Sequence, residues 1–133
     1  MWYNIYCKSI YYLGRNTVSW SIEFYETENG INCVKDFIDE IKDKKLKAKV
    51  LNDIKLLNEF GTELRQPHTD YLKDGIWELR TKQSSNIART LYFTVSGQKI
   101  ILLHGFVKKT PKTPSSELNR AINNKNDYLR RHS

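Results

Sequence analysis

The sequence has few of the cysteines that cross-link small secreted proteins and none of the long apolar runs that anchor a chain in a membrane. It contains two cysteines, three prolines and six glycines in 133 residues. Cys7 and Cys33 match neither a metal-binding spacing nor a disulfide framework, which favours a reducing cytoplasm over secretion. No apolar run approaches the ~20 residues that a membrane-spanning helix needs, and residues 1–15 lack the pattern of a signal peptide. We therefore expect a soluble, cytoplasmic chain with no membrane contact.

Several motifs of common enzymes are also absent. The sequence has no glycine-rich phosphate loop, no serine nucleophile elbow and no paired cysteine or histidine spacing suited to zinc. No cluster of carboxylates suits Mg²⁺. We therefore expect neither a metal nor a cofactor, and conventional hydrolase and zinc chemistries are unsupported.

Positive charge, in contrast, is abundant and unevenly distributed. Residues 1–76 carry 11 lysines and arginines against 12 acidic residues, whereas residues 77–133 carry 11 against three. The whole excess of the net charge of +7 thus lies in the second half. An excess of positive charge in one part of a chain attracts polyanions, nucleic acid above all. A basic, solvated surface without a partner has the same composition.

The first half predicts one strand and two helices. Residues 20–26 alternate between apolar and polar as a strand does. Asn32 is a suitable N-cap for a first helix, and a second helix is expected over residues 43–60, with Gly61 as its end. Lysines over residues 42–49 fit the solvated face of this amphipathic helix. Residues 62–72 read as a loop or short strand, in which His68 is an ordinary loop histidine.

The second half predicts three strands and a helix. Strands are expected over residues 76–82, 87–95 and 100–107, the first with one buried and one solvated face. Thr113 and Pro114 form a typical helix start, as N-cap and first helical residue. The inward face of this last helix is expected to carry Leu118, Ala121, Ile122 and Leu129. We expect one domain over residues 20–133, preceded by an extension of unclear role over residues 1–19.

Four segments resemble a known family. Residues 77–80 (WELR), 88–93 (ARTLYF), 102–114 (LLHGFVKKTPKTP) and 127–131 (DYLRR) are similar to the HigB-like, phage-derived branch of the RelE/ParE toxin superfamily. The resemblance implies an α+β, RelE-like fold, in which an N-terminal strand and two helices pack on a mainly antiparallel sheet with a C-terminal helix. It further implies a type II toxin that cleaves mRNA on the ribosome without a metal, and a helix-turn-helix, HigA-like antitoxin.

Cleavage of RNA by its own 2′-hydroxyl requires a general base, a general acid and positive charge on the phosphorane. The sequence is rich in positive charge. Arginine grips two phosphate oxygens at once, and the resemblance places Arg89 at the arginine position of the second strand of the meander, from whose end we expect it to project. The predicted catalytic residues are Arg89, Arg80 and Lys109, and the predicted RNA-binding residues are Lys82, Lys108, Lys112 and Tyr92.

The general base and acid are less clearly indicated. His104 and Glu78 are the candidates in the motif. His104 lies within an apolar strand, where a hydrogen-bonded structural histidine is the alternative, and Glu78 lies on the same strand face as Arg80, with which it can form an ion pair. Tyr92 likewise suits either stacking on a base or packing in the core.

Other functions fit parts of this pattern. A ParE-like toxin would have the same fold and inhibit DNA gyrase without nuclease chemistry. A non-catalytic double-stranded RNA-binding module has three strands followed by a helix with lysines before it, and a degenerate toxin would retain only antitoxin binding. An antitoxin is expected either to cover Arg80, Arg89 and Lys109 or to bind the N-terminal helices and block entry to the ribosome.

Overall fold

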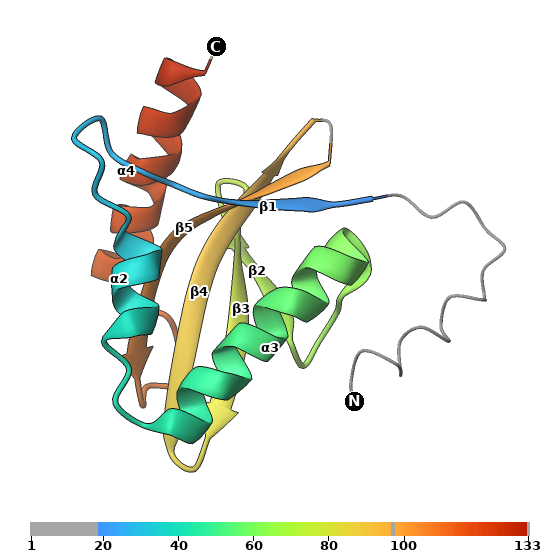
Figure 1. Ribbon diagram of the computed structural model, residues 1–133, viewed down its shortest axis with the longest axis vertical. Helices are drawn as coiled ribbons and strands as arrows, with labels where there is room; N and C mark the ends of the chain where they lie inside the picture. The colour runs from blue at the N-terminus through green and yellow to red at the C-terminus, as the bar shows by residue number, and fades with distance from the viewer. Residues whose placement is uncertain (1–18, 97, 133) are drawn as a thin grey trace, which may run out of the picture.

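The computed structural model describes residues 19–96 and 98–132. Their order is β1 (Ser21–Phe24), α2 (Cys33–Asp39), α3 (Lys44–Phe60), the 3-10 turn η2 (Gly61–Glu63), β2 (Thr69–Lys73), β3 (Ile76–Gln83), β4 (Asn86–Val95), β5 (Lys99–Lys108) and α4 (Ser115–Arg131) (Figure 1). The predicted α+β fold is confirmed, with one strand, β2, more than the sequence firmly indicated. The predicted N-terminal extension lies almost wholly outside the described residues and stays a prediction.

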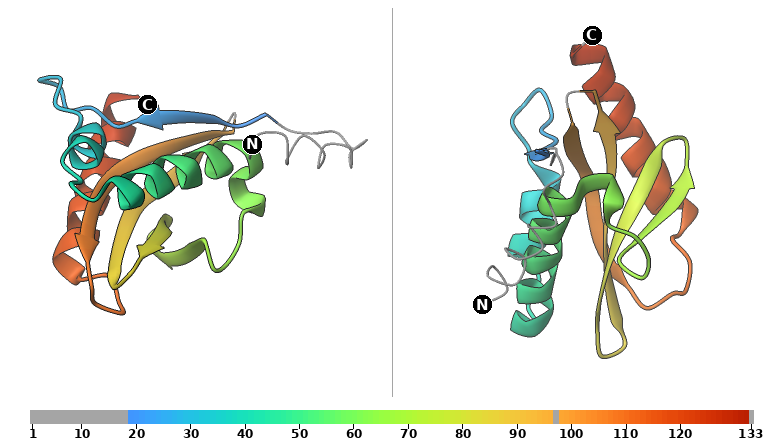
Figure 2. Two further views of the ribbon diagram at one scale, coloured as in Figure 1. Left: turned by 60° about the horizontal axis from the view of Figure 1, so that its bottom comes forward. Right: turned by 90° about the vertical axis from the view of Figure 1, so that its right-hand side faces the viewer.

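The strands form one sheet in the order β1-β5-β4-β3-β2. The β1–β5 pair is parallel and the other three pairs are antiparallel. Helices α2 and α3 cover one face of the sheet and α4 covers the other (Figure 2). The expectation of a solvated face on β3 is therefore wrong for Glu78, which is buried on the α4 side.

Each face of the sheet has its own apolar core, because helices cover both faces. The core under α2 and α3 contains Val34, Ile38, Leu46, Val50, Ile54, Leu57, Leu79, Ala88, Tyr92, Ile100 and Leu102. The core under α4 contains Tyr25, Ile76, Leu91, Phe93, Ile101, Leu103, Phe106, Ala121 and Tyr128. A bulge in the β4–β5 pairing turns both Leu103 and His104 toward α4, since Leu91 pairs with His104 and Tyr92 with Leu102.

The first two helices have the caps predicted at Asn32 and Gly61, and Asp43, expected as the first residue of the second helix, is its N-cap. The side chain of Asn32 accepts a hydrogen bond from the Lys35 backbone at 3.1 Å, and that of Asp43 accepts one from the Lys45 backbone at 2.9 Å. Gly61 ends α3 with φ at 53°, a left-handed conformation that favours glycine. Leu46, Val50, Ile54 and Leu57 face the sheet, which leaves the exposed lysines of α3 on its solvent side.

The last helix differs from the prediction in two places. Pro114 is its N-cap, and Thr113 instead donates a hydrogen bond to the Glu78 carboxylate. Farther along, Tyr128 packs in the core, whereas Leu129 is 43% exposed. The prediction that Leu129 faces inward is wrong because the large ring of Tyr128, one position earlier, fills the space between α4 and β4, edge-to-face with Phe93.

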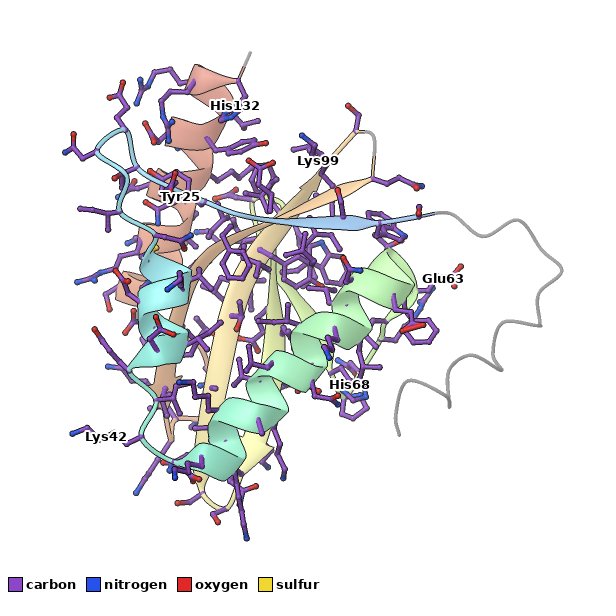
Figure 3. The ribbon with its side chains drawn as sticks, viewed as in Figure 1. Tyr25, Lys42, Glu63, His68, Lys99 and His132 are labelled. Atoms are coloured by element: carbon purple, nitrogen blue, oxygen red, sulfur yellow. The ribbon has the colours of Figure 1, made fainter. Side chains whose placement is uncertain are left out.

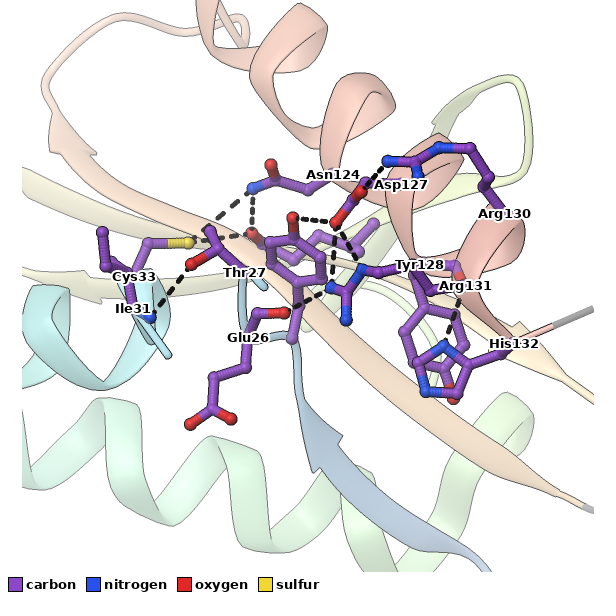
Figure 4. A network of polar contacts seen from close by, with 12 residues as sticks. Glu26, Thr27, Ile31, Cys33, Asn124, Asp127, Tyr128, Arg130, Arg131 and His132 are labelled. Carbon is purple, nitrogen blue, oxygen red and sulfur yellow. Dashed lines mark hydrogen bonds and ion pairs between the residues drawn. The ribbon is translucent and has the colours of Figure 1, made fainter. Parts of the chain in front are cut away.

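A polar network fixes the C-terminal end of α4 to the N-terminal half of the chain (Figure 4). The Tyr25 hydroxyl donates to Asp127 at 2.6 Å, and Arg131 donates both to Asp127 and to the Glu26 carbonyl. Nearer the middle of α4, the Asn124 amide donates to the Leu103 carbonyl at 2.9 Å. The hydrogen bonds from Arg131 and Tyr25 hold the pKa of Asp127 below its usual range.

None of the helices in the described ranges is long and apolar enough to cross a membrane.

Candidate functional site

A pocket of about 660 Å³, here called the cationic pocket, lies between α3, the loop before β2 and the edge of the sheet. It draws on four parts of the chain that are distant in sequence. The lining residues are Lys49, Asn52, Asp53, Pro67, His68, Arg80, Thr81, Lys82, Ile87, Arg89 and Pro111. The pocket therefore exists only in the folded chain, and no single motif encodes it.

The pocket forms where β2 stops covering β3. β2 pairs with β3 only at Ile76–Leu79, so the end of β3 from residue 80 onward is an open edge. There the Arg80 backbone donates to the His68 carbonyl at 2.8 Å, which brings the loop beside the strand. On the other side, residues 49, 52 and 53 of α3 share one helical face. Side chains from three elements thus converge at this edge.

Positive charge dominates the lining. Besides the buried Arg89, three solvent-accessible cations line the pocket, Lys49, Arg80 and Lys82, against the single carboxylate of Asp53. The Arg80 side chain is 28% exposed, and its Nε lies 3.6 Å from a Glu78 oxygen, which orients the guanidinium from outside the pocket. The Lys49 ammonium donates to the Lys82 carbonyl at 3.4 Å. Such a group of cations suits a phosphodiester.

Asp53, His68 and Lys49 are ionisable groups of this pocket that sequence reasoning missed, since Lys49 was assigned to the solvated face of its helix and His68 to an ordinary loop. The Thr81 hydroxyl donates to Asp53 Oδ2 at 2.7 Å. Burial raises the pKa of Asp53, and the Thr81 hydrogen bond and the charges of His68 and Lys49 counteract this shift. The sequence offers one signal for Asp53, because Lys49 and Asp53 are four residues apart and therefore lie on one face of a helix. No local feature of the sequence indicates that His68 lies near them.

Arg89 lies deeper than predicted. The expectation that it projects from the end of the sheet is wrong, because its side chain is 0% exposed. Its Nη2 donates to the carbonyls of Thr110 and Pro111 at 2.8 and 3.1 Å, and its Nε lies 3.4 Å from a Glu78 oxygen. Burial lowers the pKa of Arg89, which the Glu78 charge opposes. Arg89 thus holds the β5–α4 loop against the sheet.

The predicted lysines after β5 lie outside the cationic pocket. Lys108, Lys109 and Lys112 are exposed, and the loop that carries the last two reaches the pocket only at Pro111. Lys108 lies 3.6 Å from a Glu117 oxygen. The contacts of Arg89 fix this loop next to the pocket, so a longer ligand that leaves the pocket on this side would meet its charge.

The remaining predicted site residues are buried and do not line the pocket. Tyr92 packs in the core under α3, which excludes stacking on a base in this conformation. His104 Nε2 lies 2.6 Å from Glu117, a contact that joins β5 to α4. Glu78 is bonded to Thr113 and paired with both arginines. Each of the three therefore has a structural role that its surroundings explain.

Comparison with known proteins identifies the group to which this fold and pocket belong. No curated protein matches the chain. A family model described as "Phage derived protein Gp49-like (DUF891)" matches residues 36–126, which is more than half of the sequence and includes all the residues that line the cationic pocket. The chain belongs to this Gp49-like family of phage-derived proteins, part of the RelE/HigB-type toxin group.

Proposed function

We propose that the chain is the HigB-like toxin of a type II toxin-antitoxin system and that it cleaves ribosome-bound mRNA in the cationic pocket. The observation that carries this proposal is the convergence of three cations with a carboxylate and a histidine in one pocket of a toxin-family fold. Cations stabilise the charge of a phosphorane, and the other two groups are suited to proton transfer. The ParE-like alternative requires neither of those two groups.

In the proposed reaction the 2′-oxygen attacks the adjacent phosphorus, and the bond to the 5′-oxygen breaks. Asp53 accepts the 2′-hydroxyl proton, since burial makes it a stronger base than an exposed aspartate. His68, in its protonated form, gives a proton to the leaving 5′-oxygen. Arg80 and Lys82 neutralise the charge on the phosphorane. The products are a 2′,3′-cyclic phosphate and a 5′-hydroxyl.

Arg89 has a different role in this scheme from the one that the resemblance implies. Its side chain has no exposed surface, Nη2 is hydrogen-bonded to two carbonyls, and Nε lies within ion-pair distance of Glu78, although neither Nε nor Nη1 has a hydrogen-bond partner among the described residues. We therefore assign Arg89 a positioning role that acts through the β5–α4 loop. Arg80 replaces it as the arginine that contacts phosphate. Lys109 and Lys112 remain proposed contacts to RNA that leaves the pocket on the side of the β5–α4 loop.

The test is inducible expression in bacteria of the wild-type chain, Arg80→Ala, His68→Ala and the control Arg120→Ala, with growth followed and mRNA 5′ ends mapped. Arg120 is an exposed arginine on α4, away from the cationic pocket. We expect growth arrest and new 5′ ends inside translated regions with the wild type and the control. Loss of one transition-state donor typically lowers the rate ~10²- to 10³-fold, so both signals should disappear with Arg80→Ala.

The other outcomes separate the alternatives. Arrest without new 5′ ends would contradict the nuclease and favour a gyrase inhibitor. Absence of arrest with the wild type would favour a binding module or an inactive toxin. Cleavage that survives both Arg80→Ala and His68→Ala would place the active site elsewhere in the fold.

The toxin family also implies an antitoxin, and we propose a HigA-like, helix-turn-helix partner. The pocket cations favour an acidic antitoxin segment laid across Arg80 and Lys82, which would exclude the substrate phosphate. Binding to α2 and α3, with exclusion from the ribosome by bulk, is the other form of this proposal. In a complex, protection of Lys82, which lies on β3 rather than on α2 or α3, from lysine-reactive reagents would distinguish the first form from the second.

A further inference from the structure

A second pocket, here called the aromatic pocket, lies next to the cationic pocket and has different chemistry. It has a volume of about 510 Å³ and lies at the C-terminal end of α3, over the β2–β3 edge of the sheet. Two aromatic rings, Tyr71 and Trp77, form part of its wall, edge-to-face with 5.2 Å between their centroids. Arg65, Gln66 and Asp70 provide its polar groups.

Tyr71 is exposed but held in place. Half of it is accessible, an unusual position for a large aromatic side chain on an edge strand. Its hydroxyl accepts a hydrogen bond from the Gly75 backbone at 3.0 Å, and its ring contacts Trp77, which packs against the core under α3. The ring is therefore oriented before any ligand arrives, which lowers the entropic cost of binding to it.

The polar groups of this pocket suit the edge of a base better than a phosphate. Arg65 and Asp70 balance each other in formal charge, whereas cations outnumber carboxylates in the cationic pocket. The Gln66 amide donates to Asp70 at 3.2 Å, so donors and acceptors lie side by side. Unstacked RNA bases are typically recognised by an aromatic ring together with hydrogen bonds to the base edges.

The two pockets share a wall. Pro67 and His68 line the cationic pocket, and their neighbours in the chain, Gln66 and Thr69, line the aromatic one. His68 is labelled in Figure 3. Along α3, the seven steps from Asp53 to Phe60 rise about 10 Å at 1.5 Å each. At about 3.4 Å per nucleotide a stacked strand covers that distance with about three nucleotides, and a strand with an unstacked base covers it with fewer. A single RNA strand is long enough to occupy both pockets.

We infer that the aromatic pocket binds a nucleobase of the same RNA strand whose phosphate lies in the cationic pocket. This inference rests on the proposed nuclease function and adds a base subsite to it. The base stacks on Tyr71, and Arg65 and Asp70 contact its edge. The enzyme would then favour certain bases at a fixed distance from the cut.

The first test measures binding of short, single-stranded RNA in which every ribose carries a 2′-O-methyl group, so that it cannot be cut. A set of these oligonucleotides, each lacking the base at one position, is titrated against the wild type, Tyr71→Ala, Tyr71→Phe and the control Leu129→Ala. Leu129 is a similarly exposed apolar residue on α4. Stacking contributes ~1–3 kcal/mol per base, so we expect Tyr71→Ala to weaken binding about tenfold or more.

The base deletions make this test specific. One deletion should weaken binding to the wild type and have no further effect on Tyr71→Ala. Leu129→Ala should bind as the wild type does, and Tyr71→Phe, which keeps the ring but loses the hydroxyl contact to Gly75, should be weakened less than Tyr71→Ala. An equal loss with every oligonucleotide, or no loss with Tyr71→Ala, would overturn the base subsite. In either case the proposed cleavage, measured separately with Arg80→Ala, would stand.

A second measurement is made in cells and is suited to a toxin that binds RNA only on the ribosome. The mapped 5′ ends of cells that express Tyr71→Ala are compared with those of the wild type. We expect the base preference on one side of the cut to weaken, with cleavage still present. Unchanged base preference would overturn the subsite, and absence of cleavage with the wild type would overturn the proposed function as well.

Discussion

Arg89 illustrates how one buried charge can organise a site without contacting its ligand. The guanidinium lies between the sheet and the β5–α4 loop, where it is bound to the carbonyls of Thr110 and Pro111 and paired with Glu78. A fork of fixed N–H groups can satisfy several acceptors at once, which an ammonium cannot do in the same geometry. The loop therefore depends on an arginine at this position.

Removal of Arg89 is expected to destabilise the whole fold. Arg89→Ala leaves the buried Glu78 carboxylate without its closest cation, and breaking one partner of a buried pair typically costs ~3–5 kcal/mol. Urea unfolding should give that loss in the free energy of unfolding. Arg80→Ala, at the partly exposed partner of the same carboxylate, should cost about 1 kcal/mol or less. Equal losses in the two variants would contradict this division of roles.

The ionised carboxylate of Asp53 is expected to destabilise the fold at neutral pH, where the proposed general base must be ionised. Its folded-state pKa is raised, chiefly by burial, so its contribution to stability is present below the unfolded pKa, near 3.8, and is lost as pH rises through the folded value. Asp53→Asn retains an acceptor for Thr81. We expect urea unfolding to show this variant to be more stable than the wild type at pH 7, with the difference shrinking toward pH 4. RNA cleavage by this variant should fall ~10²- to 10⁴-fold and leave a residual activity.

A pH–rate profile of cleavage tests the two proton-transfer roles. A general acid must be protonated, so activity should fall at high pH, and this limb should be absent from the residual activity of His68→Ala. A general base must be ionised, so the fall at low pH should be absent from Asp53→Asn. Profiles in which both variants retain both limbs would assign proton transfer to other groups.

At the scale of elements, α2 depends on its contact with β5. A seven-residue helix is too short to be stable alone. Its Phe37 ring lies over Gly105, where an added Cβ would come within 2.2 Å of the ring. Gly105→Ala is therefore expected to cost ~1–3 kcal/mol by overpacking. Thermal or urea unfolding measures it, and the added change Phe37→Leu should recover part of the loss; no recovery would locate the strain elsewhere.

The elements themselves could be predicted from the sequence, because each has a local signal. Apolar spacing and the Asn32, Asp43 and Gly61 caps bound the two N-terminal helices, and alternation indicates the long strands. The predictions were wrong where a tertiary contact, rather than the local sequence, determined the role of a residue. Thr113 has the residue type of an N-cap, but its hydroxyl bonds to Glu78, a residue of another strand.

The site was less predictable for the same reason. Alternating charges on a strand resemble a solvated face, so the burial of Arg89 and Glu78 could not be foreseen without knowing that α4 covers that face. Asp53 and His68 belong to a helix and a loop whose proximity is a property of the fold. Arg80 and Lys82 were predicted as site residues, and the structure brings both to the same pocket.

At the scale of the whole molecule, the basic second half divides into two surfaces with different roles. Arg80 and Lys82 join Lys49 from the first half in the cationic pocket. Lys109 and Lys112 lie on the adjacent loop, held there by the buried Arg89. Net charge alone indicates a polyanionic partner, and only the fold separates cations that could contact one phosphate from those that could guide the strand.

This division predicts how RNA affinity responds to salt. Single-stranded RNA bound through three phosphate contacts should give a slope of about −2 for log K against log salt, at about −0.7 per contact. Arg80→Ala should reduce the magnitude of that slope by about 0.7. Tyr71→Ala should lower affinity at every salt concentration without changing the slope, since a stacked base releases no counterion. Fluorescence anisotropy with an uncuttable RNA measures both, and a changed slope in Tyr71→Ala would mean that the aromatic pocket holds phosphate.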